Sequence, residues 1–136
     1  VSLIDLPPTL LDMAGIPIPK SYSGISLLKE MRENKERDCV FIQISESQCG
    51  RAIRTKKYKY SVRTLAPTGY VAHNSDVYFE DYLYDLSVDP IEKNNLIKSP
   101  EYASVRAKLK DMLINEMVKA GERKPKILPA LFVRKK

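Results

Sequence analysis

Apolar and polar residues alternate through the middle of the chain, which is the pattern of strands with one buried face. In the run 57–63, Tyr58 and Tyr60 fall on one side, and Lys57 and Lys59 fall on the other. Such period-two alternation predicts β-strands. Four strands are predicted in all, at residues 40–44, 52–55, 57–63 and 82–86.

A 3.6-residue apolar period towards the C-terminal end predicts a long helix. The apolar positions that share one face of this helix are Val105, Leu109, Met112, Leu113 and Met117. Ser99 and Pro100 provide a start signal for the helix, and Gly121 provides an end signal.

Capping residues predict two further helix starts. Asp5, followed by two prolines, predicts a short helix that ends before Gly15. Asp89 and Pro90, with Glu92 close behind, predict another helix that begins with a capping box.

Together these elements predict an α+β fold. A four-stranded antiparallel sheet is packed against the long C-terminal helix and is preceded by the short helix. The strands follow one another without βαβ spacing, which argues against a parallel sheet. Residues 1–4 are expected to be the end of a strand, and residues 64–80, which contain Pro67 and Gly69, are expected to be a long loop.

The 136-residue chain has a formal net charge of +6, from 23 Lys and Arg against 17 Asp and Glu. A basic chain can bind nucleic acid, a membrane surface or a sulfated glycan. Apart from short clusters at 56–57, 124–126 and 134–136, however, the basic residues are scattered, so a solvated surface explains them. No apolar run approaches the ~18 residues of a membrane span. We therefore expect neither a nucleic-acid partner nor a membrane partner.

Candidate catalytic and metal-binding residues are sparse. His73 is the single histidine, no G-x-S-x-G sequence is present, and Cys39, Cys49 and His73 are too dispersed to predict a zinc site. The carboxylates of residues 76–89 could hold calcium, but they lack the EF-hand pattern, and strand-edge and cap positions explain most of them. We predict no catalytic and no metal-binding residue in this chain, and we expect both cysteines to be reduced.

Four segments, in fixed order, resemble the C-terminal part of the sulfatase family. They are VSLIDLPPTLLDMAGI at 1–16, GISLL at 24–28, RAIRTKKYKY at 51–60 and YDLSVDPIEKNNL at 84–96. The resemblance implies an enzyme of the alkaline phosphatase superfamily, with a large α/β catalytic domain and a smaller C-terminal domain. It places residues 1–16 at the end of the large domain and residues 17–123 in the C-terminal α+β subdomain, followed by a basic tail at 124–136.

For such enzymes the resemblance implies a formylglycine nucleophile, made from the Cys or Ser of a C-x-P-x-R sequence, beside calcium or a similar divalent ion. Neither Cys39, followed by Val-Phe-Ile, nor Cys49, followed by Gly-Arg-Ala, fits that sequence. The nucleophile and the metal ligands are therefore expected upstream of Val1, and this chain alone is expected to be inactive.

The resemblance also implies two partners, the missing N-terminal catalytic domain and a sulfated small molecule or glycan as substrate. The helix in residues 1–16 would have lost the sheet that it covers in the large domain. We therefore expect self-association through residues 5–14, because exposed apolar surface tends to find a partner.

Loop 64–80 is the expected contribution to substrate binding, because it is long for a compact domain. Tyr70, His73, Asn74 and Tyr78 would bind a sugar or aryl group through stacking and hydrogen bonds. Two alternatives stay open: a phosphoester hydrolase of the same superfamily, and a stand-alone module that binds polyanions through its positive charge. The residues upstream of Val1 would distinguish the two hydrolases.

Overall fold

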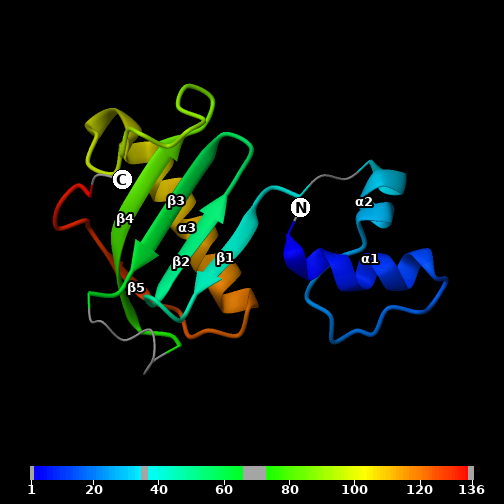
Figure 1. Cartoon of the computed structure of the whole chain (residues 1–136). Coiled ribbons are helices and arrows are strands. Elements are labelled where there is room, and N and C mark those ends of the chain that lie inside the picture. Colours follow the sequence, from blue (N-terminus) through cyan, green and yellow to red (C-terminus); the bar gives the residue numbers. More distant parts are fainter. Residues whose placement is uncertain (1, 35–36, 66–72, 135–136) are drawn as a thin grey trace. The chain divides into compact units, whose positions relative to one another are not determined.

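The structure, a computed structural model, describes residues 2–34, 37–65 and 73–134. The chain divides into two compact units, Val1–Val40 (unit 1) and Phe41–Lys136 (unit 2). Figure 1 shows the elements of each unit, and the two units are described separately.

Unit 1 contains a short 3-10 turn and two helices. These elements are η1 (Leu3–Asp5), α1 (Leu6–Met13) and α2 (Leu27–Glu33). Gly15 has a φ of 69° where the chain leaves α1, a conformation that favours glycine. Ser26 caps α2, because its side chain accepts a hydrogen bond from the backbone amide of Lys29. The short helix predicted near the N-terminus is confirmed.

One prediction for the first residues is wrong, because residues 3–5 form η1 and are not the end of a strand. Asp5 is the N-cap residue of α1, as predicted, but its side chain makes no capping hydrogen bond to the helix. The Asp5 carboxylate instead accepts hydrogen bonds from the backbone amides of Ser2 and Ile25 and from the Arg37 side chain. It therefore joins segments of unit 1 that are distant in sequence.

Gly24 lies where two of these segments touch. A Cβ atom at this position would be 1.8 Å from the carbonyl oxygen of Ile4. Only glycine fits without moving the backbone, and the close approach brings the amide of Ile25 within 3.1 Å of the Asp5 carboxylate.

Unit 2 is built around a five-stranded sheet of order β1-β2-β3-β4-β5. The strands are β1 (Val40–Ile44), β2 (Gly50–Arg54), β3 (Tyr58–Arg63), β4 (Val77–Asp85) and β5 (Lys126–Leu128). β3 pairs antiparallel with β2 and with β4, whereas β5 runs parallel to β4 (Figure 1).

One face of this sheet is covered by α3 (Ala103–Lys119), which follows a 3-10 turn, η2 (Pro100–Tyr102) (Figure 1). The helix buries Leu109, Leu113 and Met117, three of the residues predicted for its apolar face. The strand register places three buried sheet residues opposite one another: Ile53, Tyr60 and Leu83. The predicted α+β fold, with an antiparallel sheet under a long C-terminal helix, is confirmed.

The sheet contains one strand more than predicted, because β5 lies within the segment predicted as a basic tail. β4 also begins at Val77, five residues before the predicted start at residue 82. β5 is too short to show an alternating pattern. The start of β4 contains buried Glu80 and Asp81, whose charges are paired with Arg106 and Arg63. Because these buried residues are charged, the sequence lacks the alternation of apolar and polar residues that predicts a strand.

The helix predicted at Asp89 does not form, and that prediction is wrong. Glu92 has a φ of 57°, in the left-handed region, which interrupts any helix. The Asp89 carboxylate accepts hydrogen bonds from the amides of Lys93 and Asn94, so it stabilises a turn. The Glu92 carboxylate pairs with Lys59 of β3 at 2.8 Å and does not complete a capping box.

Candidate functional site

Two of the four predicted substrate-binding residues are exposed neighbours. The side chains of His73 and Asn74 are open to solvent just before β4. Tyr78, the second residue of β4, is fully buried. Tyr70 lies outside the described residues. We refer to residues 73–76, which connect directly to β4, as the 73–76 segment.

Tyr78 and β5 hold the end of the 73–76 segment nearest β4. The phenolic oxygen of Tyr78 accepts a hydrogen bond from the amide of Ser75 at 3.1 Å and lies 3.6 Å from the Cys49 Sγ. Burial, and the contact with Cys49, raise the pKa of Tyr78 well above its usual range, so this hydroxyl stays protonated at neutral pH. The Asp76 carbonyl oxygen accepts a hydrogen bond from the amide of Lys126 at 2.8 Å.

Arg51 of β2 holds the other end of the segment. It lies on the same face of the strand as Ile53, towards α3, and is only 3% exposed. Its Nη2 donates a hydrogen bond to the carbonyl oxygen of His73 at 2.6 Å. Its Nη1 donates to the carbonyl oxygens of Gly50 at 2.7 Å and Ile44 at 3.2 Å. One side chain thus joins β1, β2 and the 73–76 segment.

The charge of Arg51 is balanced by Glu122, which follows α3. Gly121, with a φ of 88°, turns the chain at the helix end, and the Glu122 amide donates a hydrogen bond to the Met117 carbonyl oxygen at 3.0 Å. The Glu122 Oε1 accepts hydrogen bonds from the Arg51 Nε at 2.6 Å and from the Gln43 Nε2 at 2.9 Å. The Glu122 Oε2 is buried, and no described residue is its hydrogen-bond partner.

Neither Arg51 nor Glu122 was predicted from the sequence as part of a site. A signal was present for Arg51, because alternation with Ile53 places it on the core-facing side of a strand. Glu122 had no such signal, since its position depends on how α3 ends and on a contact with a residue 71 positions earlier in the chain.

The described residues do not form a metal centre. No group of three or more His, Cys, Asp or Glu side chains within the described ranges is placed to hold a metal ion. The carboxylates of the described residues therefore do not fit a calcium site. Cys39 and Cys49 are thiols and do not form a disulfide, as predicted. None of the helices in the described part of the chain is long and apolar enough to cross a membrane.

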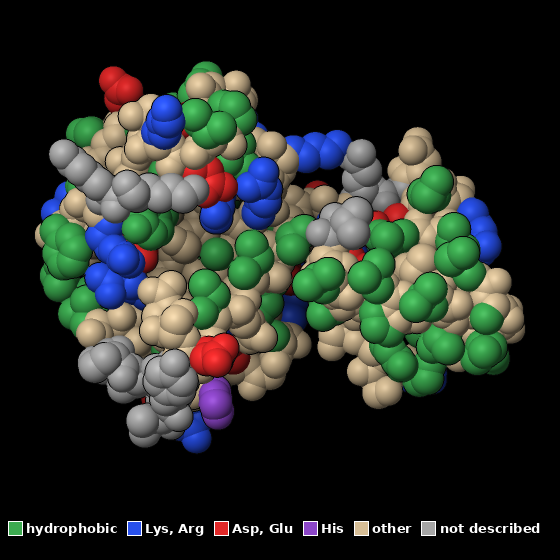
Figure 2. All heavy atoms as spheres, in the orientation of Figure 1, with side chains coloured by type: hydrophobic (Ala, Val, Ile, Leu, Met, Phe, Trp, Pro, Cys, Tyr) green, Lys and Arg blue, Asp and Glu red, His purple; other side chains and the backbone are tan. Residues whose placement is uncertain are grey.

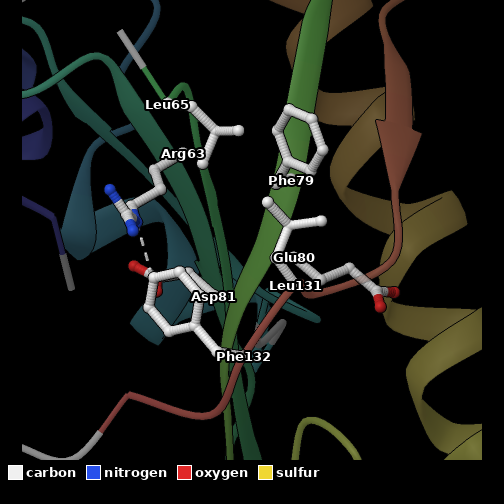
Figure 3. Close-up of a pocket in the computed structure, with 7 residues that line it drawn as sticks. All are labelled: Arg63, Leu65, Phe79, Glu80, Asp81, Leu131 and Phe132. Carbon is white, nitrogen blue, oxygen red and sulfur yellow. Dashed lines mark ion pairs between the residues drawn. The ribbon is translucent and has the colours of Figure 1, made fainter. Parts of the chain in front are cut away.

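A pocket between β4 and the C-terminal residues is small. It is lined by Arg63, Leu65, Phe79, Glu80, Asp81, Leu131 and Phe132 (Figure 3). Its volume is about 10 Å³, which is close to the minimum for one water molecule. The Nε of Arg63 pairs with the Asp81 carboxylate at 3.3 Å, so the basic group at this pocket is neutralised. This pocket is too small for a sugar or an aryl group.

The fold and the four sequence segments agree with comparisons to known proteins. The chain is 34% identical over 118 residues to the Delta 4,5-hexuronate-2-O-sulfatase of Bacteroides thetaiotaomicron, an alignment that covers 81% of this chain and 22% of that protein. Its structure is similar to that of a 2-O GAG sulfatase, with a TM-score of 0.68, 30% identity, and coverage of 86% of this chain and 24% of the other.

A third comparison shows how widely the fold is shared. The phosphonate monoester hydrolase of Agrobacterium radiobacter has a TM-score of 0.57 at 24% identity, and the match covers 85% of this chain and 24% of that one. The chain therefore spans 22% to 24% of the length of these three relatives.

These features define the class of protein: a C-terminal α+β region of sulfate-ester hydrolases in the alkaline phosphatase-like superfamily. The family described as N-sulphoglucosamine sulphohydrolase, C-terminal, matches residues 1–119, and the chain belongs to this family of sulfatase C-terminal regions. The resemblance to sulfatases seen in the sequence is confirmed.

Proposed function

We propose that this chain is part of a complete sulfatase that hydrolyses sulfate esters, in which it supports the catalytic domain and shapes the rim of the substrate cleft. In this proposal residues 1–16 complete the large domain, residues 17–123 form the C-terminal subdomain, and residues 124–136 form a basic tail that contributes β5. The catalytic domain supplies the formylglycine nucleophile and the calcium ion. The chain alone is therefore expected to be inactive.

The exposed apolar surface of unit 1 is evidence that this unit binds a large apolar partner. Leu3 is 82% exposed and Met31 is 77% exposed. Figure 2 shows apolar side chains gathered on unit 1, and the exposed large ones are Leu3, Ile4, Leu6, Leu10, Met13, Ile16, Ile18, Tyr22, Ile25 and Met31. Apolar surface at this density is typical of an interaction surface. The proposed partner is the N-terminal catalytic domain.

The 73–76 segment is the proposed substrate-facing part of loop 64–80. The observation that carries this proposal is that hydrogen bonds hold the backbone of the segment while the side chains of His73 and Asn74 are exposed. Such an arrangement can hydrogen-bond the hydroxyl or sulfate groups of a sulfated glycan with little loss of backbone entropy. Tyr70 remains a proposed stacking group, whereas Tyr78 would act by holding Ser75.

The test compares two substrates in the intact sulfatase. We expect His73→Ala and Asn74→Ala each to lower kcat/KM for a sulfated disaccharide by about tenfold, the effect of losing one hydrogen bond to a charged group. Hydrolysis of 4-nitrophenyl sulfate, which lacks the sugar, should stay close to the wild-type rate. Asp111→Ala, an exposed substitution on α3, is the control and should change neither. Equal losses on both substrates would contradict a role in recognition.

A second candidate function is hydrolysis of a phosphoester or phosphonate ester. The similarity in fold to a phosphonate monoester hydrolase favours it. The catalytic domain decides between the two candidates, because a C-x-P-x-R sequence upstream supports a sulfatase, whereas Thr or Ser in another setting supports phosphoester chemistry. A stand-alone polyanion-binding module is less well supported, since several basic side chains, such as Arg51 and Lys59, are already paired with carboxylates.

A further inference from the structure

We infer that Arg51 is a positioning residue for substrate recognition: its buried guanidinium sets the backbone of the 73–76 segment and thereby the placement of His73 and Asn74. This inference rests on the proposed function of that segment. Arg51 itself is 3% exposed, so it acts through His73 and not by direct contact with a substrate.

The geometry of the guanidinium supports this role. Nη2 donates a hydrogen bond to the His73 carbonyl oxygen at 2.6 Å, while Nε donates to the Glu122 carboxylate at 2.6 Å. Nη1 is held by two further carbonyl oxygens. Because the guanidinium is planar and its donors have fixed directions, these bonds prevent it from rotating. Arg51 is a residue of β2, so its hydrogen bond to His73 fixes the 73–76 segment relative to a rigid strand of the sheet.

Other contacts cannot replace Arg51 at this end of the segment. The Ser45 hydroxyl also donates to the His73 carbonyl oxygen, but at 3.3 Å and in an exposed position. The hydrogen bonds of Ser75 and Asp76 hold the opposite end. If Arg51 were removed, the 3.3 Å hydrogen bond from Ser45 is what would remain to the His73 carbonyl oxygen among the described residues.

The contact with Glu122 allows positioning to be separated from stability. Arg51→Met alone would leave the Glu122 carboxylate buried without its counter-ion, a change that destabilises proteins for electrostatic reasons. The double variant R51M/E122Q removes both charges and leaves no uncompensated ion. Glu122→Gln alone keeps the hydrogen bond from Arg51 to His73 but leaves the buried guanidinium without its counter-ion, so it measures the loss of the ion pair by itself. The Glu122 variants therefore distinguish loss of the ion pair from loss of the contact to the segment.

Amide hydrogen exchange of this chain, measured by NMR, provides the first readout. The Ser75 amide is the probe, because its hydrogen bond to Tyr78 reports how the segment is placed. We expect exchange at Ser75 to be about tenfold faster in R51M/E122Q, the effect of losing one charge-assisted hydrogen bond, and unchanged in Glu122→Gln. Arg54→Met is the matched control, since Arg54 lies on β2 but pairs with Glu92.

Arg51→Lys provides a second test of the inference, which remains usable if R51M/E122Q does not fold. Lysine keeps the positive charge beside Glu122, but a single ammonium group cannot reproduce the fork that reaches both Glu122 and His73. Exchange at Ser75 should therefore also be faster in Arg51→Lys. Unchanged exchange at Ser75 in both folded variants would overturn the inference, whatever the kinetics show.

Kinetics of the intact sulfatase provide the second readout. R51M/E122Q and Arg51→Lys should raise KM for the sulfated disaccharide by about tenfold with kcat unchanged, because binding energy common to the ground state and the transition state is lost. Hydrolysis of 4-nitrophenyl sulfate should be unaffected. If exchange at Ser75 accelerates but neither substrate responds, Arg51 still positions the segment, and the proposed role of the segment in recognition fails.

Discussion

The Asp5 carboxylate has no exposure to solvent, yet it is placed to carry a negative charge. It accepts hydrogen bonds from the amides of Ser2 at 2.8 Å and Ile25 at 3.1 Å, and from the Nη2 of Arg37 at 2.9 Å. Burial alone would raise its pKa, but these hydrogen bonds and the charge of Arg37 outweigh burial and lower the pKa of Asp5 below its ordinary value.

This lowered pKa predicts that unit 1 is sensitive to acid. Because the folded pKa lies below the unfolded value of about 3.9, the stabilisation is fully present above that pH and is lost as the pH falls through the folded pKa. Asp5→Asn should destabilise unit 1 at neutral pH and flatten this acid dependence. Chemical denaturation at a series of pH values, followed through NMR signals of α1, checks the expectation.

Asp38→Asn is the control for the acid experiment, because Asp38 is an exposed carboxylate of the same unit. It should leave the acid dependence of unit 1 unchanged. An Asp5→Asn protein that loses stability in acid as steeply as the wild type would show that another group is responsible.

At the scale of elements, the turn that follows β4 depends on the carboxylate of Asp89. This carboxylate is 8% exposed and accepts hydrogen bonds from the amides of Lys93 at 3.1 Å and Asn94 at 2.7 Å. Next to this turn, the Asn95 Oδ1 accepts a hydrogen bond from the amide of Leu83 at 3.1 Å, which attaches the connection to β4.

Asp89→Ala should lower the free energy of unfolding of unit 2 by about 1–3 kcal/mol, because it leaves two backbone donors without their acceptor. Urea denaturation measures the change. Asp111→Ala, exposed on α3, should stay within about 0.5 kcal/mol of the wild type. A change of similar size in both variants would mean that the carboxylate of Asp89 has no special part in the turn.

Elements with a long periodic pattern were predictable from sequence, and short or polar ones were not. α3 was predicted because Leu109, Leu113 and Met117 repeat at helical spacing and are buried together. β5 was missed because its pairing with β4 is decided by tertiary structure across a large sequence separation. The turn at Asp89 has the local sequence of a helix start, but the positive φ of Glu92 overrides that propensity.

The candidate site was predictable only in its exposed part. The long polar loop between predicted strands indicates His73 and Asn74. The pairing of Arg51 with Glu122 has no signal in the sequence, because sequence pattern alone does not show which charges meet in a folded core. Tyr78 was predicted as a contact to substrate, a role that the structure does not test, and it is placed in the core.

At the scale of the whole molecule, the exposed apolar surface of unit 1 predicts self-association when no catalytic domain is present. Sedimentation velocity of this chain should show oligomers that increase with concentration. Leu10→Asp, which places a charge at a 64% exposed position of α1, should shift the chain towards monomer. A version that begins at Lys20, and therefore lacks α1, should do the same.

Val88→Asp is the matched control, because Val88 is 75% exposed but belongs to unit 2. It should not change the oligomeric state. A chain that remains monomeric at high concentration would argue that residues 1–16 belong with the C-terminal subdomain and need no other partner.

The contacts of the 73–76 segment also have an order in time. During synthesis on a ribosome, Arg51 emerges before the segment, whereas Glu122 and Lys126 emerge only after the whole of α3. At a synthesis rate of about 5–20 residues per second, Glu122 and Lys126 are added several seconds after the 73–76 segment. A nascent chain, or a chain shortened by a stop codon shortly before Glu122, would contain β1 to β4 and α3 but would lack the counter-ion of Arg51 and the Lys126 amide that holds Asp76. Loss of the chain from Glu122 onward would then appear as altered substrate preference.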